Sequence, residues 1–393
     1  MAKHRRPHKG SYKSLDSEGI GKLFDGMFAF GSKDRRITFF VDLPHSDLED
    51  TDDWRWLREF ATKARWLFPK KNQHGRIIVD LVVFPATGAD GAPLPREGFY
   101  WSWDLPKQME TLPGWARRIS ITEALEFCDC AVFATRWSAT SVLKRMVKEN
   151  QLSVRIATLP GFTQEMMPVF SVDPKEAARR TLVIKALLDQ TVSADLRFVA
   201  DDEWFELHVD LRHPSEEYDR KASTGQITEP GQVANGIPAE AFVAPYDGED
   251  SETNGILPIQ IGPNDHPIFY RFEKNRVVEV FGKNRWTDVE RALIEETPTR
   301  GNLAELGFGV MAGLGVPPLS DFLNPDDVML LIEKLGFHIA FGDGGRVSAP
   351  IHRDHVFLKD YMPRVRLSWL YLNLVDGSRR KIMVNNNYMN DLF

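Results

Sequence analysis

The sequence predicts an α/β protein, with an N-terminal α/β domain built on a mostly parallel sheet and a second, β-rich α+β domain. Up to about residue 190, strand-like and helix-like segments alternate, which is the pattern of a parallel sheet with helical crossovers. Beyond it, short strand-like runs are separated by Pro, Gly, Asn and Asp, as in antiparallel sheets. We therefore predict domains over residues 31–193 and 194–393.

The composition excludes several classes of protein. A chain of 393 residues, 42% of them hydrophobic, is long enough for more than one buried core. Its net charge of −7 gives no sign of a nucleic-acid-binding surface, and no apolar run is long enough to cross a membrane. The two cysteines, Cys128 and Cys130, imply no disulfide framework. We expect a cytoplasmic protein that binds neither nucleic acid nor membranes.

The chain begins with a basic segment. Its first thirteen residues carry five Lys and Arg and no acid, and they lack the apolar stretch of a signal peptide. We predict a disordered tail over residues 1–30, with a basic interaction arm as the alternative.

The predicted first domain starts with a strand, a helix and a strand. Residues 36–43 are β-branched and aromatic, which favours a strand. Apolar residues then recur at spacings of three and four from Trp54 to Phe68, one face of an amphipathic helix. Residues 76–84 are almost continuously apolar, as in a strand buried on both sheet faces. The further predicted elements are a long loop over 85–118, helices over 121–127, 139–150 and 174–190, and strands over 130–135 and 153–158.

The predicted second domain ends in a β-hairpin over residues 364–374 and 381–385, joined by the turn pair Asp376-Gly377. Before it we predict strands over 195–199, 204–211, 241–244, 256–261, 267–272 and 276–281, and helices over 287–296 and 325–336. The acidic segment 247–255 lacks the spacing of a calcium-binding loop, so we interpret it as a solvated turn.

A candidate metal-ligand pair, His352 and Asp354, lies in this second domain. In an extended segment, residues two apart project to the same face, so an imidazole and a carboxylate point the same way. A divalent ion is held by such groups. The alternative is a hydrogen bond that merely orients the histidine on an exposed strand.

Three further residues have the chemistry of metal ligands. Glu240 and Glu305 are embedded among small and apolar residues. Burying a carboxylate costs several kcal/mol unless it is paired or metal-bound. The alternative is a helix cap or a salt bridge. His338 precedes an apolar run, and its alternative is a hydrogen-bonded core histidine.

The segments around these residues resemble the metallo-aminopeptidases of the aminopeptidase T and aminopeptidase S type. The resemblance covers residues 195–393, and the final hairpin is also similar. The segments that carry it, in chain order, are 238–245 (PAEAFVAP), 304–309 (AELGFG), 338–342 (HIAFG) and 348–354 (SAPIHRD).

The resemblance implies a site for two divalent metal ions, zinc or cobalt, that activate water against a small peptide. The implied ligands are Glu240, Glu305, His338, His352 and Asp354. One of the two glutamates, both implied to be catalytic, would bridge the metals or shuttle the proton. The resemblance also implies a homodimer.

The chain departs from the family at several points: Arg353 stands where the family has a tryptophan, one extra residue precedes His352, and the loop before His352 is shorter. The loop from Gly342 to Ser348 lacks the tyrosine that the family carries there. His355 could substitute for it, or could lie on the opposite face of the strand from Asp354. Two alternatives to a hydrolase therefore stay open. One is a repurposed, non-catalytic member that binds a peptide or precursor. The other is an Fe(II) ring-cleaving dioxygenase on the same scaffold, with a His/His/Asp set.

Overall fold

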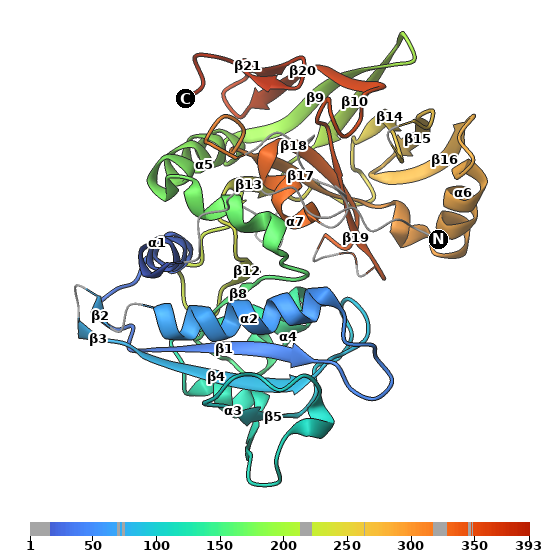
Figure 1. Cartoon of the computed structure of the whole chain (residues 1–393). Coiled ribbons are helices and arrows are strands. Elements are labelled where there is room, and N and C mark those ends of the chain that lie inside the picture. Colours follow the sequence, from blue (N-terminus) through green and yellow to red (C-terminus); the bar gives the residue numbers. More distant parts are fainter. Residues whose placement is uncertain are drawn as a thin grey trace.

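The computed structural model describes residues 16–68, 71–72, 75–212, 222–262, 264–316, 328–344, 347 and 349–393. Residues 1–15, which include the whole basic segment, lie outside these described residues, as do residues 325–327 of a predicted helix and Ser348. The architecture is mixed α/β, as predicted. Figure 1 shows a part with one mostly parallel sheet, largely in blue and cyan, below a β-rich part in green, yellow and red.

The lower part is built on a first sheet with the strand order β12-β8-β7-β1-β4-β5-β6. Strands β1 and β7 are buried along nearly their whole length, because helices cover both faces of the sheet. This explains why their sequences are continuously apolar. The parallel strands and their connecting helices are β1 (Arg36–Leu43), α2 (Asp52–Leu67), β4 (Ile78–Pro85), α3 (Ile121–Glu126), β7 (Cys130–Ala134), α4 (Thr140–Glu149) and β8 (Arg155–Thr158).

The long loop predicted over residues 85–118 is wrong in part. Within it, strand β5 (Glu97–Tyr100) pairs antiparallel with β4, and β6 (Arg117–Ser120) pairs with β5. Both strands are only four residues long and are separated by a Pro- and Gly-rich segment. Strands this short give too little alternation to be recognised in the sequence. They extend the sheet at its edge.

The predicted tail over 1–30 is also wrong for its second half, because helix α1 (Ser17–Phe28) begins there. The Asp16 carboxylate caps it, accepting a hydrogen bond from the Gly19 amide at 2.7 Å. Ile20, Phe24 and Met27 form a buried face at helical spacing. The charged residues around them masked this pattern.

Strand β12 (Val233–Asn235) connects the two parts of the molecule. It lies beyond the boundary predicted at residue 193, yet it pairs in parallel with β8 at the edge of the first sheet. Five residues after its end, the chain enters β13 (Glu240–Val243) of the upper part. The first sheet therefore holds one end of the segment that leads to Glu240.

The upper part consists of two antiparallel sheets that pack face to face. Phe341 of β18 contacts Tyr270 and Phe272 of β15, with ring centroids 5.1 and 5.6 Å apart. The second sheet, in spatial order, is β16 (Arg276–Gly282), β15 (Ile268–Glu273), β14 (Asn254–Ile259), β10 (Glu203–Asp210), β9 (Thr191–Ala200), β20 (Val365–Leu374), β21 (Arg379–Val384) and β22 (Asn387–Tyr388). The third is β11 (Ser223–Thr224), β13, β17 (Leu303–Gly309), β18 (Phe337–Gly342) and β19 (His352–Val356).

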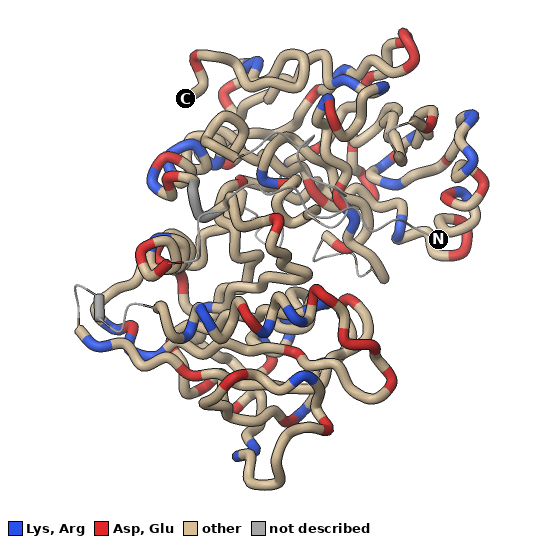
Figure 2. Tube along the Cα trace, in the orientation of Figure 1, with Lys and Arg blue, Asp and Glu red and all other residues tan. Residues whose placement is uncertain are grey.

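Helices α5 (Pro174–Leu188) and α6 (Thr287–Glu296) agree with the sequence prediction. The helix predicted over 325–336 is shorter: the described residues contain α7 (Met329–Ile332) and the 3-10 turn η7 (Glu333–Leu335). Charges of both signs are interspersed over the described residues, for example along α2 (Figure 2). Among these residues, no helix is both long and apolar enough to span a membrane.

A buried arginine joins the first sheet to the chain segments beside it, and this generates a prediction about stability. The Arg155 guanidinium lies 2.6 Å from the Asp34 carboxylate and donates to the Phe28 and Ile227 carbonyls. Substituting Arg155→Met should reduce the free energy of unfolding by about 3–5 kcal/mol, because Asp34 then loses its buried partner. Urea unfolding followed by circular dichroism measures this change.

The matched control is Arg145→Met, on the exposed side of α4, which should change the free energy of unfolding by less than about 0.5 kcal/mol. Equal effects of the two substitutions would contradict the role of Arg155.

Candidate metal centre

The third sheet separates polar from apolar side chains by simple alternation. Leu306 and Phe308 of β17 and Phe337 of β18 are fully buried in the main hydrophobic core. The residues between them point to the other face, because successive side chains of a strand alternate. On that face β17 presents Glu305 followed by glycines, and β18 presents His338. The small residues leave room above the sheet for the polar groups.

Strand register brings the five candidate ligands to this one face. Glu240 pairs with Gly309, and Gly307 pairs with His338. On β19, Asp354 pairs with Ala340 and His352 with Gly342. All five sequence-predicted residues therefore lie on the same side of adjacent strands.

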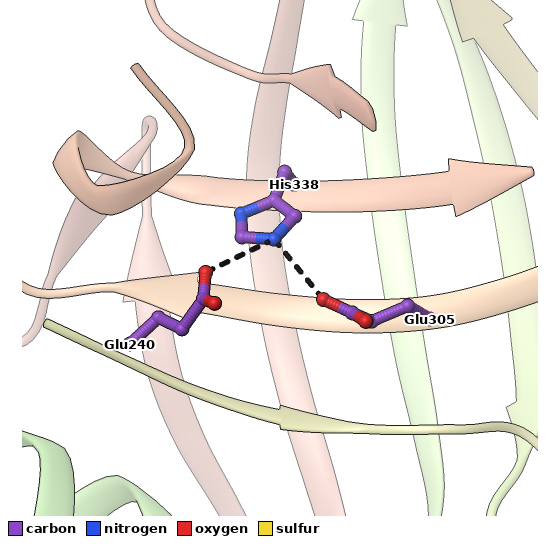
Figure 3. Close-up of side chains that lie close together, drawn as sticks. All are labelled: Glu240, Glu305 and His338. Atoms are coloured by element: carbon purple, nitrogen blue, oxygen red, sulfur yellow. Dashed lines mark hydrogen bonds and ion pairs between the residues drawn. The ribbon is translucent and has the colours of Figure 1, made fainter. Parts of the chain in front are cut away.

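The first group of side chains is Glu240, Glu305 and His338 (Figure 3). The His338 Nε2 atom lies 3.4 Å from Glu305 Oε1 and 3.6 Å from Glu240 Oε2. Glu240 and His338 are buried, with side chains 8% and 1% exposed. One ligand atom from each residue lies within 4.8 Å of the others, so a single ion could be held between them.

The second group is Glu305, His352 and Asp354. The His352 Nε2 atom lies 3.9 Å from Glu305 Oε2 and 3.6 Å from Asp354 Oδ1. The His352 side chain is 41% exposed, so this group lies at the rim of the site. Glu305 belongs to both groups and offers a different oxygen to each.

Backbone carbonyls set the orientation of both imidazoles. His338 Nδ1 lies 3.2 Å from the Gly336 carbonyl, and His352 Nδ1 lies 2.7 Å from the Asp343 carbonyl. Each Nδ1–H donates to its carbonyl, which leaves Nε2 facing the carboxylates. Histidines that bind metals are held by such hydrogen bonds on the other ring nitrogen.

The carboxylates perturb the pKa of both histidines. Burial by itself would lower the pKa of His338, but the hydrogen bond with Glu305 and the charges of Asp354 and Glu240 raise it to about 9. Burial would likewise lower the pKa of His352, but Asp354 and the charge of Glu305 raise it to about 10. In return, the pKa of Asp354 is held far below its usual range, chiefly by His352 against the effect of burial. Without a metal, protons on the imidazoles offset the carboxylates.

Two buried oxygens of the cluster have no hydrogen-bond partner: Glu240 Oε2 and Asp354 Oδ1. An unsatisfied buried carboxylate oxygen is costly. Both atoms face His338 Nε2, at 3.6 and 4.0 Å. Oxygen and imidazole nitrogen ligands that converge with unsatisfied lone pairs fit a divalent cation such as zinc. The chain's own residues therefore fit a metal site.

The opposite face of β19 carries a structural contact instead of a catalytic group. The Arg353 guanidinium forms a bidentate ion pair with Glu290 of α6, at 2.9 and 2.7 Å. His355 packs edge-on against Phe341, and burial lowers the pKa of His355 well below its usual value. His355 thus lies on the opposite face of the strand from Asp354, away from the candidate ligands.

Sequence reasoning missed two charged residues behind the site, Glu333 and Lys334. Both are buried in η7, immediately before β18. The Lys334 Nζ atom lies 2.5 Å from Glu240 Oε1 and 2.6 Å from Glu333 Oε1. Adjacent Glu and Lys at the end of a helix usually indicate a solvated helix terminus, and only the apolar residues on both sides hinted at burial.

The fold is shared with two solved structures. One is 2,5-dihydroxypyridine dioxygenase from Pseudomonas putida KT2440, at a TM-score of 0.57 and 15% identity over 96% of this chain and 98% of that chain. The other is wild-type AmpT, an aminopeptidase T, from Thermus thermophilus, at a TM-score of 0.52 and 14% identity over 95% of this chain and 98% of that chain. No family model and no curated protein sequence matches the chain. At these identities the likeness shows the fold alone.

The raised pKa values of the histidines predict that the metal-free protein becomes less stable as the pH rises. The raised pKa values give stability that is complete below about pH 6.5, the ordinary histidine pKa, and is lost as the pH passes through about 9 to 10. Glu333, whose burial raises its pKa to about 8, changes stability in the same direction. Melting temperatures of chelator-treated protein should fall between pH 6.5 and 10. Metal-loaded protein should show a smaller fall, and parallel curves for the two forms would contradict the assignment.

Gly307 generates a second prediction, because it lies directly beneath His338. A Cβ atom at Gly307 would lie 1.9 Å from His338 Nε2, closer than any real contact. Substituting Gly307→Ala should displace the imidazole and weaken metal binding by at least about tenfold. Competition with a chromophoric chelator measures this affinity.

Gly114→Ala is the control, since a Cβ atom there meets nothing within 4 Å. This variant should bind metal like the wild type. If Gly307→Ala also bound like the wild type, His338 Nε2 would not be a ligand.

Proposed function

We propose that the chain is a metal-dependent aminopeptidase or a closely related amide hydrolase, which uses two divalent ions to activate water against a small peptide. One observation carries this proposal: Glu305 turns one oxygen to His338 and the other to His352, so one carboxylate is shared by two ligand groups. Two-metal sites hold their ions about 3.5–4 Å apart, and a carboxylate that belongs to both ligand groups would suit such a pair.

The ligands divide into two sets in this proposal. Glu240 Oε2, Glu305 Oε1 and His338 Nε2 would hold one ion. Glu305 Oε2, His352 Nε2 and Asp354 Oδ1 would hold the other. A mixed carboxylate and imidazole set suits zinc or cobalt. Such ions would supply Lewis acidity for activating water and for polarising the amide carbonyl.

The surroundings of the two glutamates assign them different roles. Both oxygens of Glu305 face imidazoles, so Glu305 would be the residue shared by the two ions. Lys334 binds Oε1 of Glu240, which leaves only Oε2 free, so Glu240 would hold a single ion. The half-exposed His352 marks the side from which a substrate reaches the site, since His338 is buried.

Glu305→Gln tests the proposed hydrolase. The amide removes the bridging charge, so the variant should lose bound metal and at least about a hundredfold in the rate of aminoacyl anilide hydrolysis. Metal content is measured by elemental analysis and hydrolysis by anilide release. The exposed Glu149→Gln is the matched control and should keep both properties. A Glu305→Gln variant that holds two ions and cleaves normally would refute the proposal.

A ring-cleaving iron dioxygenase is the second candidate, favoured by one specific observation. His338, His352 and Asp354 form a two-histidine, one-carboxylate set, the ligand set of many non-haem iron oxygenases. Glu240 and Glu305 at the same site favour two ions instead. Anaerobic loading with Fe(II), followed by oxygen uptake on 2,5-dihydroxypyridine, would support the dioxygenase.

The absence of a tyrosine between Gly342 and Ser348, together with the burial of His355, keeps a non-catalytic, peptide-binding role as a further alternative. Rapid turnover of aminoacyl anilides after metal reconstitution would exclude it. We also propose that the chain forms a homodimer. Sedimentation velocity measures the mass of the species in solution and tests this.

A further inference from the structure

Behind the candidate metal centre, a buried ammonium group lies between two carboxylates. The Lys334 side chain is fully buried, and its Nζ atom contacts Glu240 Oε1 at 2.5 Å and Glu333 Oε1 at 2.6 Å. Taking a lysine out of water costs several kcal/mol, and an apolar residue would fill the same space more cheaply. The contact therefore points to a role beyond filling the core.

Glu333 extends this contact to the other side of the site. The buried Glu333 carboxyl group contacts Lys334, and Asp354 and Glu240 are the other charged carboxylates close to it. A hydrogen bond between Glu333 and Asp354 is among the interactions that hold the pKa of Asp354 low. A continuous series of side-chain contacts thus runs from Glu240 through Lys334 and Glu333 to Asp354.

The two residues at the ends of this series of contacts are each a candidate ligand in only one of the two ligand groups. Glu240 belongs to the first group and Asp354 to the second, while Glu305 belongs to both. The pair Glu333 and Lys334 forms a second connection between the same two groups. Each outer carboxylate is left with one unpaired buried oxygen that faces His338 Nε2.

The backbone holds this pair firmly against the sheet. The Met311 amide donates to the Lys334 carbonyl at 2.9 Å, and the Gly309 amide donates to the Gly336 carbonyl at 3.0 Å. A Cβ atom at Gly309 would lie 2.3 Å from the Glu333 carbonyl oxygen, so only glycine allows η7 to approach this closely. The lysine therefore enters the site from a fixed position.

We propose that Glu333 and Lys334 are positioning residues that couple the two halves of the metal centre, by fixing Glu240 and Asp354 so that one oxygen of each faces the ions. This inference rests on the proposed function, since it presupposes the two ions. We call the pair Glu333 and Lys334 the clamp. Because the clamp contacts one ligand in each group, its loss should weaken the binding of both ions, although Lys334 itself contacts only one ligand.

The Lys334 ammonium group could act by positioning Glu240 or only by its charge. These two roles predict opposite changes in metal affinity for Lys334→Met. If the ammonium acted only by its charge, removing it would make the site more negative and would strengthen cation binding. If it positions Glu240, metal binding should weaken by about ten- to a hundredfold, the usual effect of removing a partner of a metal ligand. The sign of the change in affinity separates the two.

Glu333 supplies a matched pair of variants in the full-length chain. Glu333→Gln keeps the size of the side chain, can accept from Lys334 and can donate to Asp354, so it should bind metal within about threefold of the wild type. Glu333→Leu keeps neither bond and should weaken binding by about ten- to a hundredfold. This pair keeps the proposal testable even if Lys334→Met fails to fold.

The experiment titrates Co(II) into the chelator-treated wild type and the three variants. It records the visible absorption spectrum, the number of ions bound and their affinities, with circular dichroism as the control for folding. Weaker binding of both ions and altered spectra in Lys334→Met and Glu333→Leu, with recovery in Glu333→Gln, support the clamp. Unchanged or tighter binding in folded Lys334→Met or Glu333→Leu overturns it. A wild type that binds no divalent ion overturns the proposed function and the clamp with it.

Discussion

The structure depends on one electrostatic constraint: three carboxylates, Glu240, Glu305 and Asp354, lie on a single face of the third sheet and are largely shielded from water. Like charges at such distances in a protein interior repel strongly, so they persist only with cations between them. The two histidines and Lys334 supply those cations in the metal-free protein. The glycines of β17 and the carbonyls that orient the imidazoles serve the same cluster.

This constraint explains how the layers around the site are arranged. Because side chains alternate along a strand, the face opposite the carboxylates must be apolar, and it packs against the second sheet through Phe341 and its neighbours. At both ends the site is tied to other parts of the fold. Strand β12 anchors the approach to Glu240 in the first sheet, and the Arg353–Glu290 ion pair fixes β19 to α6.

The five candidate ligands could be named from the sequence because the segments around them resemble those of a known family, and because His352 lies two residues before Asp354. The structure brings their side chains together in two overlapping groups. The parallel sheet was also predictable, from the apolar runs that form β1 and β4. By contrast, the pairing of β12 with β8 depends on contacts between residues far apart in the chain, which no local pattern encodes. The burial of Lys334 was also not predictable, since an adjacent Glu and Lys usually indicate exposure. Only the fold shows that Gly309 allows η7 to lie close against the sheet.

Charge balance bears on how many ions the site can hold. Without metal, the protonated imidazoles of His338 and His352, together with Lys334, offset Glu240, Glu305 and Asp354. Ligation requires neutral imidazoles, so one divalent ion replaces the two protons with no change in net charge. A second ion adds two positive charges, which further negative charge at the site would have to offset. In the proposed hydrolase, the anion that develops when an amide is attacked would supply part of that negative charge.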